Sequence, residues 1–550
     1  MPDGASAADT RAEQERSVNG ASGPYRVLAC DHIDPAGLAI LSPMAQVDSR
    51  EPLSPADLAR LIGDYDALLV RSATKVTNEV FEAAGRLKIV GRAGVGVDNI
   101  DVAAATRHGV IVVNSPEGNT VAAAEHAVGL MLALARRIPG ADGAMKDGQW
   151  GRERFVGIEL YHKILGILGL GKIGQRVATV ARALGMRVIG TDPFLTPDKA
   201  AELGIDMVDF DRLLAESDFI TIHVPRTPDT THLFGEAAFA RIKPGVRLIN
   251  CARGGIVDEA ALAAALRSGR VAGAALDVFE KEPLGESALR DLGDQVVLTP
   301  HLGASTEEAQ LKVAVDVAEQ VAAVLAGEPA RSAVNIPSMR PEHMEPVRPF
   351  LQIAEKLGLL LGQLLDGPVR RLEVVYSGGL AERNTDPLTT AVLKGLLSGA
   401  VAEGVNYVNA PIVAKERGLE VRSSRTSEAG EFHDLLEVSC EAGAGVRRTV
   451  AGTLFGEGNP RIVRIDEQRF NMEPEGHILI APHEDVPGVV GRIGTLLGSN
   501  NINIFGLQLG RKFRRGPAVM ALNVDEAIPP PLLETIGSLP GFHDVKCVKL

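Results

Sequence analysis

The sequence predicts an α/β protein of several domains, and three observations support that fold class. The chain has 550 residues, of which 45% are hydrophobic and 23% charged, so it can bury a large core but is too long for one compact domain. Short β-rich runs alternate with helical stretches along most of the chain, as in parallel sheets with crossover helices. The 59 glycines and the low aromatic content of 4% suit tight turns and Ala, Val and Leu packing. We therefore expect about three or four domains.

The elements begin after a polar tail. Residues 1–24 are small and polar without an apolar core, which predicts disorder rather than a signal or transit peptide. Four strands are expected in residues 25–117, in the runs YRVLAC, DALLVRS, LKIVGRAG and VIVVNS. The run VAAAEHAVGLMLALARR then predicts a helix long enough to bridge two domains or form an interface. Six further strands define a second α/β domain over residues 118–303, in the runs KILGILGLG, MRVIGTD, DFITIHV, VRLINCA, GAALDVF and VVLTP.

Two more units are expected in the rest of the chain. A helix over residues 307–325 ends at GEPARSAVNIP, whose Gly and Pro residues indicate a linker. The runs RLEVVYSG, LLEVSCEA, RTVAGTLF and RIVRID, with a helix after Pro387, predict another α/β domain over residues 336–470. In residues 475–550 a strand, a Pro-Gly turn, an amphipathic helix and a second strand precede two more strands. This order predicts a compact βαββαβ module.

Charge and cysteine content exclude several classes of protein. Lys and Arg number 57 against 70 Asp and Glu, a net charge of −13, which disfavours a general binder of nucleic acid or of an anionic membrane. An anionic ligand must therefore find a local basic pocket. The four cysteines lie far apart with no CxxC pair, so we expect no disulfide framework, no metal site and a reducing, cytoplasmic interior. Gly, Pro or charge cuts every apolar stretch well short of about 18 residues, so no membrane span is expected.

A glycine-rich turn in the second domain predicts a dinucleotide site. Gly169, Gly171 and Gly174 directly follow the strand KILGIL and open a helix. In such a turn the first glycine allows the bend, the second lets the backbone approach a pyrophosphate, and the third lets the helix pack on the strand. Asp192 ends the next strand, about 18 residues later, where an acid holds the ribose hydroxyls. Because Asp192 would repel a 2′-phosphate, NAD is favoured over NADP; the alternative is an α/β turn that binds no phosphate.

Three charged residues follow three later strands of the same domain. They are Arg253 in INCARGGIVDE, Glu282 in LDVFEKEP and His301 in LTPHLGAST, and an open α/β sheet binds its ligands beyond such strand ends. Hydride transfer between an alcohol and a nicotinamide needs a proton acceptor, a role suited to His301. Glu282 would fix the tautomer and stabilise the imidazolium, and Arg253 would hold a carboxylate and polarise the adjacent carbonyl. We interpret His126 and His223 as structural or solvated.

Several motifs resemble the D-isomer-specific 2-hydroxyacid dehydrogenases: CARGGIVDE, ALDVFEKEP and PHLGAST, with GLGKIG far inside the chain. VRSATKVT, GRAGVGVDNID, MKDGQW and the extended C-terminus most resemble the long-form members, which oxidise 3-phospho-D-glycerate to 3-phosphooxypyruvate as the entry to L-serine synthesis. The resemblance runs from about Tyr25 to the C-terminus. It implies a flavodoxin-like substrate domain in two parts, 25–117 and 304–334, with a Rossmann NAD domain, 118–303, inserted between them.

The resemblance also implies roles for individual residues. The catalytic residues would be Arg253, Glu282 and His301, with His301 as proton shuttle. The cofactor contacts would be Gly169, Gly171, Lys172, Ile173, Gly174, Asp192, Val224, Cys251, Ala252 and Asp277. The substrate loops would be Arg71-Ser72 and Arg92 to Gly94, and Arg152 would complete a phosphate pocket from a neighbouring subunit. Val95 stands where many relatives carry Thr. The residue types agree, because Arg71, Lys75 and Arg92 are basic residues at strand ends of an acidic protein; the alternative for them is a solvated rim.

The C-terminal units resemble regulatory domains. Residues 336–470 resemble the intervening, allosteric substrate-binding domain of the long form, and 475–550 resemble an ACT domain, a small-molecule sensor that pairs with a copy of itself. That resemblance implies contacts of L-serine with His483, Asp485 and Asn503, in a homodimer or homotetramer. The alternative is that Asp485 caps the helix and Asn503 ends a strand. Four clustered arginines of the intervening domain are candidates to hold an anion or form a solvated face: Arg447, Arg448, Arg461 and Arg464.

Other functions stay open, both among the 2-hydroxyacid dehydrogenases and outside them. A hydroxypyruvate, lactate or 2-hydroxyglutarate dehydrogenase, or a secondary 2-oxoglutarate reductase activity, would use the same catalytic residues on unphosphorylated substrates. Those substrates need fewer arginines than the first domain offers. The same fold also serves as an NAD-sensing scaffold or corepressor, and such proteins can keep the catalytic residues.

Overall fold

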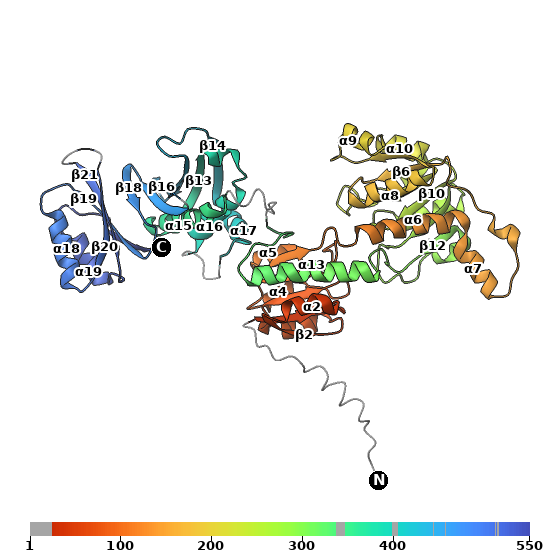
Figure 1. Cartoon of the computed structure of the whole chain (residues 1–550), viewed down its shortest axis with the longest axis horizontal. Coiled ribbons are helices and arrows are strands. Elements are labelled where there is room, and N and C mark those ends of the chain that lie inside the picture. The colour runs from red at the N-terminus through yellow and green to blue at the C-terminus, as the bar shows by residue number, and fades with distance from the viewer. Residues whose placement is uncertain are drawn as a thin grey trace, which may run out of the picture.

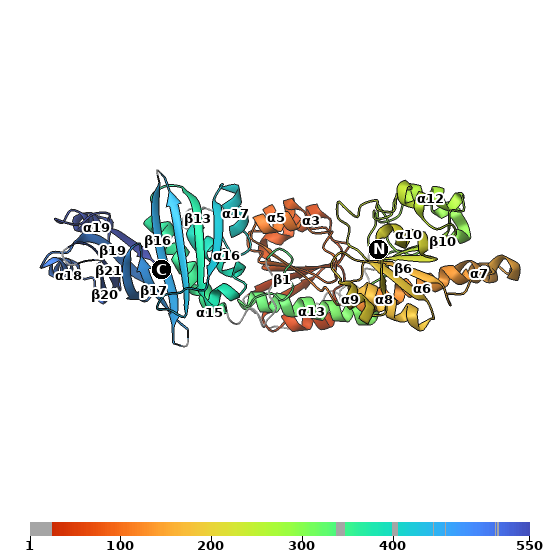
Figure 2. The ribbon, with the colours of Figure 1, turned by 90° about the horizontal axis from the view of Figure 1, so that it is seen from above.

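The computed structural model describes residues 25–336, 347–398 and 405–550, apart from 444, 457, 512, 514 and 515. The tail predicted over residues 1–24 lies outside the described residues. Four β-sheets follow one another along the molecule, with the seven-stranded sheet and the C-terminal sheet at opposite ends (Figures 1 and 2). The α/β fold class is confirmed.

The first sheet has five parallel strands in the order β2-β1-β3-β4-β5, which is the flavodoxin-like order. Its elements are β1 (Tyr25–Ala29), α2 (Pro35–Leu41), β2 (Ala45–Ser49), α3 (Pro55–Leu61), β3 (Ala67–Val70), α4 (Asn78–Glu82), β4 (Ile89–Arg92), α5 (Val102–Arg107) and β5 (Ile111–Asn114). Strand β2 is missing from the sequence prediction because its run, AQVDS, is polar. Such a composition is tolerated because β2 lies at the edge of the sheet.

A helix that follows the second domain in sequence completes the first. Helix α13 (Glu307–Leu325) packs its apolar face, including Val317 and Val321, against the first sheet beside α2. The two helices approach closely, since a Cβ on Gly37 would lie 2.7 Å from the carbonyl oxygen of Ala314. The chain therefore leaves the first domain, builds the second and returns, as the family resemblance implies.

The second sheet has seven parallel strands in the order β12-β11-β10-β9-β6-β7-β8. Its strands are β6 (Ile164–Leu168), β7 (Arg187–Thr191), β8 (Asp206–Met207), β9 (Phe219–Ile222), β10 (Val246–Asn250), β11 (Val271–Leu276) and β12 (Val296–Leu298). Its helical segments are α6 (Thr120–Arg136), α7 (Ile138–Lys146), η2 (Arg152–Phe155), α8 (Lys172–Ala183), α9 (Pro197–Glu202), α10 (Phe210–Glu216), α11 (Glu236–Arg241), α12 (Glu259–Arg267) and η3 (Arg290–Gln295). The strand order reverses between β6 and β9, and open α/β sheets bind ligands beyond the strand ends at such a point.

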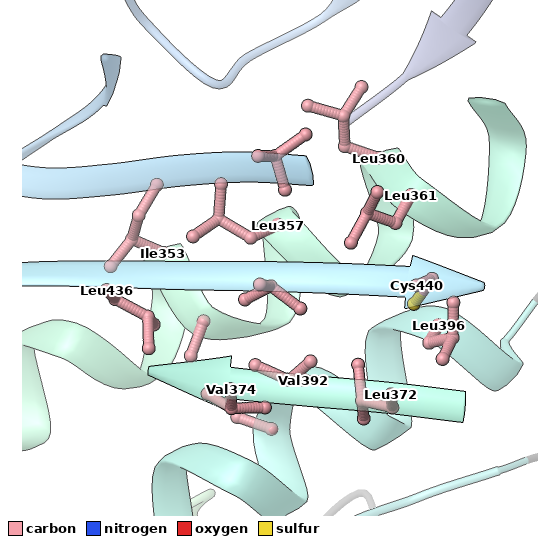
Figure 3. Close-up of a cluster of buried hydrophobic side chains, with 14 of the residues drawn as sticks. Ile353, Leu357, Leu360, Leu361, Leu372, Val374, Val392, Leu396, Leu436 and Cys440 are labelled. Atoms are coloured by element: carbon pink, nitrogen blue, oxygen red, sulfur yellow. The ribbon is translucent and has the colours of Figure 1, made fainter. Parts of the chain in front are cut away.

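The third sheet is mixed, with the order β14-β13-β15-β16-β17-β18. Its elements are α15 (Arg348–Leu364), β13 (Val369–Gly378), η4 (Gly379–Glu382), α16 (Asp386–Leu397), α17 (Ala410–Glu416), β14 (Glu420–Thr426), β15 (Asp434–Ala442), β16 (Val446–Phe455), β17 (Asn459–Ile465) and β18 (Gln468–Met472). Figure 3 shows Ile353 and Leu357 of α15 and Val392 of α16 packed with strand residues such as Leu436. The two edge strands, β14 and β18, are missing from the sequence prediction because both are rich in polar residues.

The fourth sheet is antiparallel, in the order β20-β21-β19-β22. Its elements are β19 (His477–Glu484), α18 (Val489–Ser499), β20 (Ile504–Arg511), β21 (Pro517–Val524), α19 (Pro530–Gly537) and β22 (Lys546–Lys549), which confirms the βαββαβ order. Gly488 has φ of +87° as it turns the chain into α18. Ile478, Ile480 and Val548 belong to the same buried cluster as the third domain, so these two domains share a core.

Three general features bear on function. None of the described helices is long and apolar enough to cross a membrane. The part of the chain that the structure describes holds no group of three or more His, Cys, Asp or Glu placed to bind a metal. The four cysteines are free thiols.

Candidate active site

The glycine turn after β6 has the shape of a pyrophosphate cradle. Gly169 has φ of +93°, and a Cβ there would lie 2.7 Å from the carbonyl oxygen of His223. A Cβ on Gly174 would lie 2.1 Å from the Gly169 oxygen, so the third glycine lets α8 pack against the turn. Gly171 has open space instead, with no atom within 4 Å of its Cβ position. The open side therefore faces the N-terminus of α8, where backbone N–H groups favour an anion.

An acid and a base flank this turn. Asp192, just after β7, accepts hydrogen bonds from the backbone N–H of Leu170 (2.7 Å) and of Phe194 (2.8 Å). The first bond ties the carboxylate to the glycine turn, which is where a ribose would sit. Lys172 forms an ion pair with Glu117, which lies in the segment before α6. These residues fit a dinucleotide without a 2′-phosphate.

The other residues predicted to contact the cofactor lie near the ends of neighbouring strands. Val224 follows β9, while Cys251 and Ala252 follow β10. Burial raises the pKa of the Cys251 thiol, so this thiol is not poised as a nucleophile. Ile173 stands in the first turn of α8. The topology thus gathers these positions at one edge of the sheet.

Asp277 anchors the loop that carries His301. The carboxylate is fully buried and accepts hydrogen bonds from Thr299 Oγ1 (2.6 Å) and from the N–H groups of Leu302 (2.7 Å) and Gly303 (2.8 Å). The Nε2 atom of His126 lies 3.2 Å from the same carboxylate, which gives this histidine a structural contact. Burial would raise the pKa of Asp277, but these hydrogen bonds outweigh it and lower the pKa. The predicted cofactor contact of Asp277 stays a prediction.

His301 and Glu282 form a pair at the ends of β11 and β12. Nδ1 of His301 lies 2.7 Å from Oε2 of Glu282, whose other oxygen accepts the N–H of Phe279 (3.1 Å). Burial raises the pKa of Glu282, but the hydrogen bonds from His301 and Phe279 outweigh it, so the pKa is lowered and the group stays a carboxylate. A proton held on Nδ1 leaves Nε2 able to accept another, which is the arrangement of a general base.

Arg253 reaches across from the second domain to the first. Its Nε donates to Oδ2 of Asp98 (2.9 Å), and its Nη1 donates to the carbonyl oxygen of Ala252 (2.7 Å). Asp98 lies in the loop after β4, so the pair joins the two sides of the cleft. The sequence did not single out Asp98, because nothing in its neighbourhood indicates a partner in another domain.

Arg92 and Arg71 bring two more cations to Arg253. Burial and the nearby charges of Arg253 and Arg71 lower the pKa of Arg92 to about 10. Its Nε is buried without a hydrogen-bond partner. A Cβ on Gly94, which has φ of +150°, would lie 1.4 Å from Nη1 of Arg92, so only glycine leaves room for this guanidinium. Arg92 thus lies close enough to Arg253 and Arg71 to be repelled by both guanidinium groups, and such a gathering of cations favours an anion.

The loop that carries Arg71 and Ser72 is held by two residues missing from the sequence prediction. Asp31, buried after β1, accepts the N–H groups of Arg71 (2.9 Å) and Thr74 (3.0 Å). The side-chain amide of Asn99 donates to the carbonyl oxygens of the same two residues, at 2.8 and 2.7 Å. Ser72 is exposed on this loop. Asp31 lies two residues after β1, which is a weak signal, whereas Asn99 lies seven residues after β4 and has none.

Arg152 does not join these residues within one chain. It is exposed in η2, a segment that packs on α7 and on η3, where Arg154 pairs with Asp294. Figure 1 shows α7 projecting from the far end of the NAD domain, away from the first sheet. Trp150, beside η2, is 78% exposed. A role for Arg152 in the substrate pocket therefore requires a second chain.

Of the three residues predicted to contact L-serine, only two lie in one pocket. His483 and Asp485 line one pocket with Pro487, Gly516 and His543. His483 is buried and its Nε2 has no hydrogen-bond partner, while Asp485 pairs with Arg511 at 2.8 Å rather than capping α18. Asn503 lies elsewhere, just before β20, and donates to Asp525 (2.7 Å).

The arginines of the intervening domain are paired with acids, which corrects the expectation of a cluster that could hold an anion. Arg448 pairs with Asp466 (2.8 Å) and, across the domain boundary, with Asp544 (3.2 Å). The other three pairs are Arg447 with Glu373, Arg461 with Glu473 and Arg464 with Glu437. Because each positive charge has a carboxylate partner, the cluster offers no free cation to a ligand.

Comparisons with known proteins agree with this architecture. Residues 128–303 match the D-isomer specific 2-hydroxyacid dehydrogenase NAD binding domain, 346–466 the D-3-phosphoglycerate dehydrogenase intervening domain, and 477–541 the ACT domain. A solved D-lactate dehydrogenase from Aquifex aeolicus, complexed with NAD and lactic acid, is 28% identical with a TM-score of 0.52, covering 57% of this chain and 100% of its own.

Two curated relatives match almost the whole chain. The D-3-phosphoglycerate dehydrogenase of Synechocystis is 51% identical over 526 residues, covering 96% of this chain and 95% of the relative. The enzyme of the same name from Archaeoglobus fulgidus is 48% identical over 508 residues, covering 92% of this chain and 96% of the relative. The chain therefore belongs to the D-3-phosphoglycerate dehydrogenase family of the D-isomer-specific 2-hydroxyacid dehydrogenases.

Proposed function

We propose that this chain oxidises 3-phospho-D-glycerate to 3-phosphooxypyruvate with NAD, the first step of L-serine biosynthesis. The observation that carries the proposal is a base beside an anion site. His301 is paired with Glu282 at 2.7 Å, and Arg92 is repelled by the guanidinium groups of Arg253 and Arg71. A substrate with a carboxylate, a phosphate and a hydroxyl group between them would satisfy both features.

The residues of the chain divide the reaction between them. Nε2 of His301 takes the proton of the substrate hydroxyl as the hydride leaves the same carbon. Glu282 stabilises the imidazolium that forms, because its carboxylate already accepts the Nδ1 hydrogen. Arg253 orients the substrate carboxylate and stabilises the developing carbonyl oxygen, while Arg92 and Arg71 hold the phosphate. The bound NAD supplies the hydride acceptor.

The cofactor preference rests on Asp192. Its carboxylate is tied to the glycine turn through the N–H of Leu170, where it would accept hydrogen bonds from ribose hydroxyls and repel a 2′-phosphate. Gly171 leaves the space for the pyrophosphate, and Lys172 stands at the N-terminus of α8 beside it. These features support NAD.

We further propose that L-serine regulates the enzyme at the C-terminal domain. In the pocket lined by His483 and Asp485, the Asp485 carboxylate, which also pairs with Arg511, would accept an ammonium group, and Nε2 of His483, which has no hydrogen-bond partner, would face a polar atom of the ligand. Asn503 lies outside that pocket in one chain, so a second copy would supply it. The same requirement for a second chain holds for Arg152, which supports a homo-oligomer of two or four chains.

A steady-state assay tests the function. NADH formation is followed with 3-phosphoglycerate and NAD while the product is removed by a coupled reaction, for the wild type and for His301→Ala. We expect turnover by the wild type only. Turnover with hydroxypyruvate or 2-oxoglutarate, but not with 3-phosphoglycerate, would point to another 2-hydroxyacid, and binding of NAD without any turnover would point to a scaffold.

Isothermal titration tests the regulator. L-serine is added to the wild type and to Asp485→Asn, with D-serine as the control ligand. We expect heat of binding only when L-serine is added to the wild type. We expect none with Asp485→Asn and none with D-serine. Absence of heat at millimolar L-serine would rule out the sensor.

A further inference from the structure

We propose that Asp98 is a positioning residue that orients the Arg253 guanidinium from the opposite side of the cleft. The inference rests on the proposed oxidation, in which Arg253 holds the substrate carboxylate. Asp98 itself would touch neither substrate nor cofactor; it acts through Arg253.

Two hydrogen bonds fix the plane of the Arg253 guanidinium. Nε donates to Oδ2 of Asp98 at 2.9 Å, and Nη1 donates to the carbonyl oxygen of Ala252 at 2.7 Å. The bond to Ala252 comes from the neighbouring residue, so it cannot by itself select one direction for a long side chain. The bond to Asp98 adds a fixed point 155 residues away in sequence. With Nε held and Nη1 partly engaged, Nη2 remains to bind an incoming carboxylate.

The backbone of the Asp98 loop is shaped around the same group. A Cβ on Gly96 would lie 2.0 Å from Nη2 of Arg253 and 2.9 Å from its Cζ. Any side chain at position 96 would therefore displace the guanidinium. Gly96 provides the space and Asp98 provides the acceptor, so two positions of one loop define where Arg253 lies.

The charges around Arg253 make this acceptor necessary. Burial is the largest cause of the lowered pKa of Arg92. The positive charges of Arg253 and Arg71 are the next largest causes. Asp98 acts in the opposite direction, since its negative charge favours the cationic form of Arg92. The side chain of Arg253 is 30% exposed, so without Asp98 the repulsion from Arg92 would turn it towards solvent.

The pair also makes the orientation of Arg253 depend on both domains. Arg253 follows β10 of the NAD domain, whereas Asp98 follows β4 of the first domain. The guanidinium is thus held only where the two sides of the cleft meet. A binding group that is oriented before the substrate arrives contributes more to the rate than one that must be ordered by it.

A double-mutant cycle on kcat/KM for 3-phosphoglycerate tests the proposal. The variants are Asp98→Ala, Arg253→Lys and the double variant. We expect Asp98→Ala to lower kcat/KM by about tenfold, the lower figure for loss of a charge-assisted hydrogen bond, because Asp98 is 59% exposed and water screens its charge; KM for NAD should stay within about twofold of wild type. In the Arg253→Lys background the same change should cost less than about threefold, because lysine has no Nε–H for Asp98 to hold. Asp98→Asn, which keeps an acceptor oxygen, should fall between wild type and alanine.

Asp101→Ala is the matched control from the same loop. Asp101 accepts the N–H of Ala104 at 2.9 Å and caps α5, so its loss should lower the thermal midpoint and change kcat/KM equally in both Arg253 backgrounds. Equal losses on Asp98→Ala in both backgrounds would overturn the proposal. If Asp98→Ala does not fold, the cycle is run with Asp98→Asn under the same criterion. A wild type without activity on 3-phosphoglycerate would refute the proposed function, whereas an active wild type with an additive cycle would refute only the role of Asp98.

Discussion

Replacing Glu282 with Gln should lower kcat/KM by about tenfold. The change keeps the size of the side chain and an oxygen that accepts the Nδ1 hydrogen of His301, but it removes the negative charge 2.7 Å away. A hydrogen bond to a charged group contributes about 1.5–3 kcal/mol. The two side chains are 43% and 37% exposed, so water screens the charge and the lower figure applies. About 1.4 kcal/mol in the transition state is a factor of about ten in rate.

The loss should lie in kcat rather than in KM, because the imidazolium exists only after the proton has moved. The assay is the initial rate of NADH formation as a function of pH. The pKa of Glu282 is lowered, so the wild type keeps its carboxylate above that value, and its advantage over Glu282→Gln should shrink as pH falls through it. Glu286→Gln, an exposed glutamate on the same segment, is the control. A Glu282→Gln enzyme within about twofold of wild type at neutral pH would refute the reasoning.

Three further substitutions give separate readouts. Asp192→Ala should raise KM for NAD and let NADP bind more tightly, because the repulsion of a 2′-phosphate is lost; steady-state kinetics with both cofactors measures this, and an unchanged ratio would contradict it. Arg152→Ala should raise KM for 3-phosphoglycerate more than it lowers kcat, and an unchanged KM would remove the cross-subunit role. Asp277→Ala should lower the stability by about 1–3 kcal/mol, since it leaves the donors of the 299–303 loop unpaired in a buried site. The pKa of Asp277 is lowered in the folded chain, so its carboxylate contributes to the free energy of unfolding at pH values above the ordinary pKa of an aspartate. That contribution is lost as the pH falls through the folded-state pKa. Thermal unfolding at several pH values checks both statements.

The sequence predicts buried parallel strands well and exposed edge strands poorly. Strands such as β3 and β9 are buried along their whole length and apolar except for Thr221, because helices cover both faces of a parallel sheet. Strand β14 is exposed along nearly its whole length and reads EVRSSRT, and β8 has only two residues. Such strands are held by backbone pairing to a neighbour, as β14 is by β13, and backbone pairing leaves no hydrophobic period in the sequence.

The contact between His301 and Glu282 could be predicted because it depends only on the order of strands within one sheet. His301 and Glu282 each follow a strand of one sheet, and parallel strands bring their C-terminal ends to the same edge. Asp31 and Asn99 could not be assigned in this way. Each holds the backbone of the Arg71 loop through a side chain, and such a bond requires only a polar residue at the right place in space.

The loop after β4 shows why residue type and spacing alone do not predict every contact of the candidate site. The sequence predicts Gly94 in a substrate-binding loop and does not single out Gly96, and each accommodates a guanidinium, that of Arg92 at Gly94 and that of Arg253 at Gly96. The second of these comes from another domain, so its partner Asp98 has no signal of its own in the sequence. Arg92, predicted as a separate binding residue, is thus repelled by Arg71 and Arg253, and Asp98 supplies a counter-charge beside Arg253. Substitutions at Arg92, Arg253 and Asp98 should consequently be non-additive, in contrast to substitutions that pair any of them with Asp192 at the glycine turn.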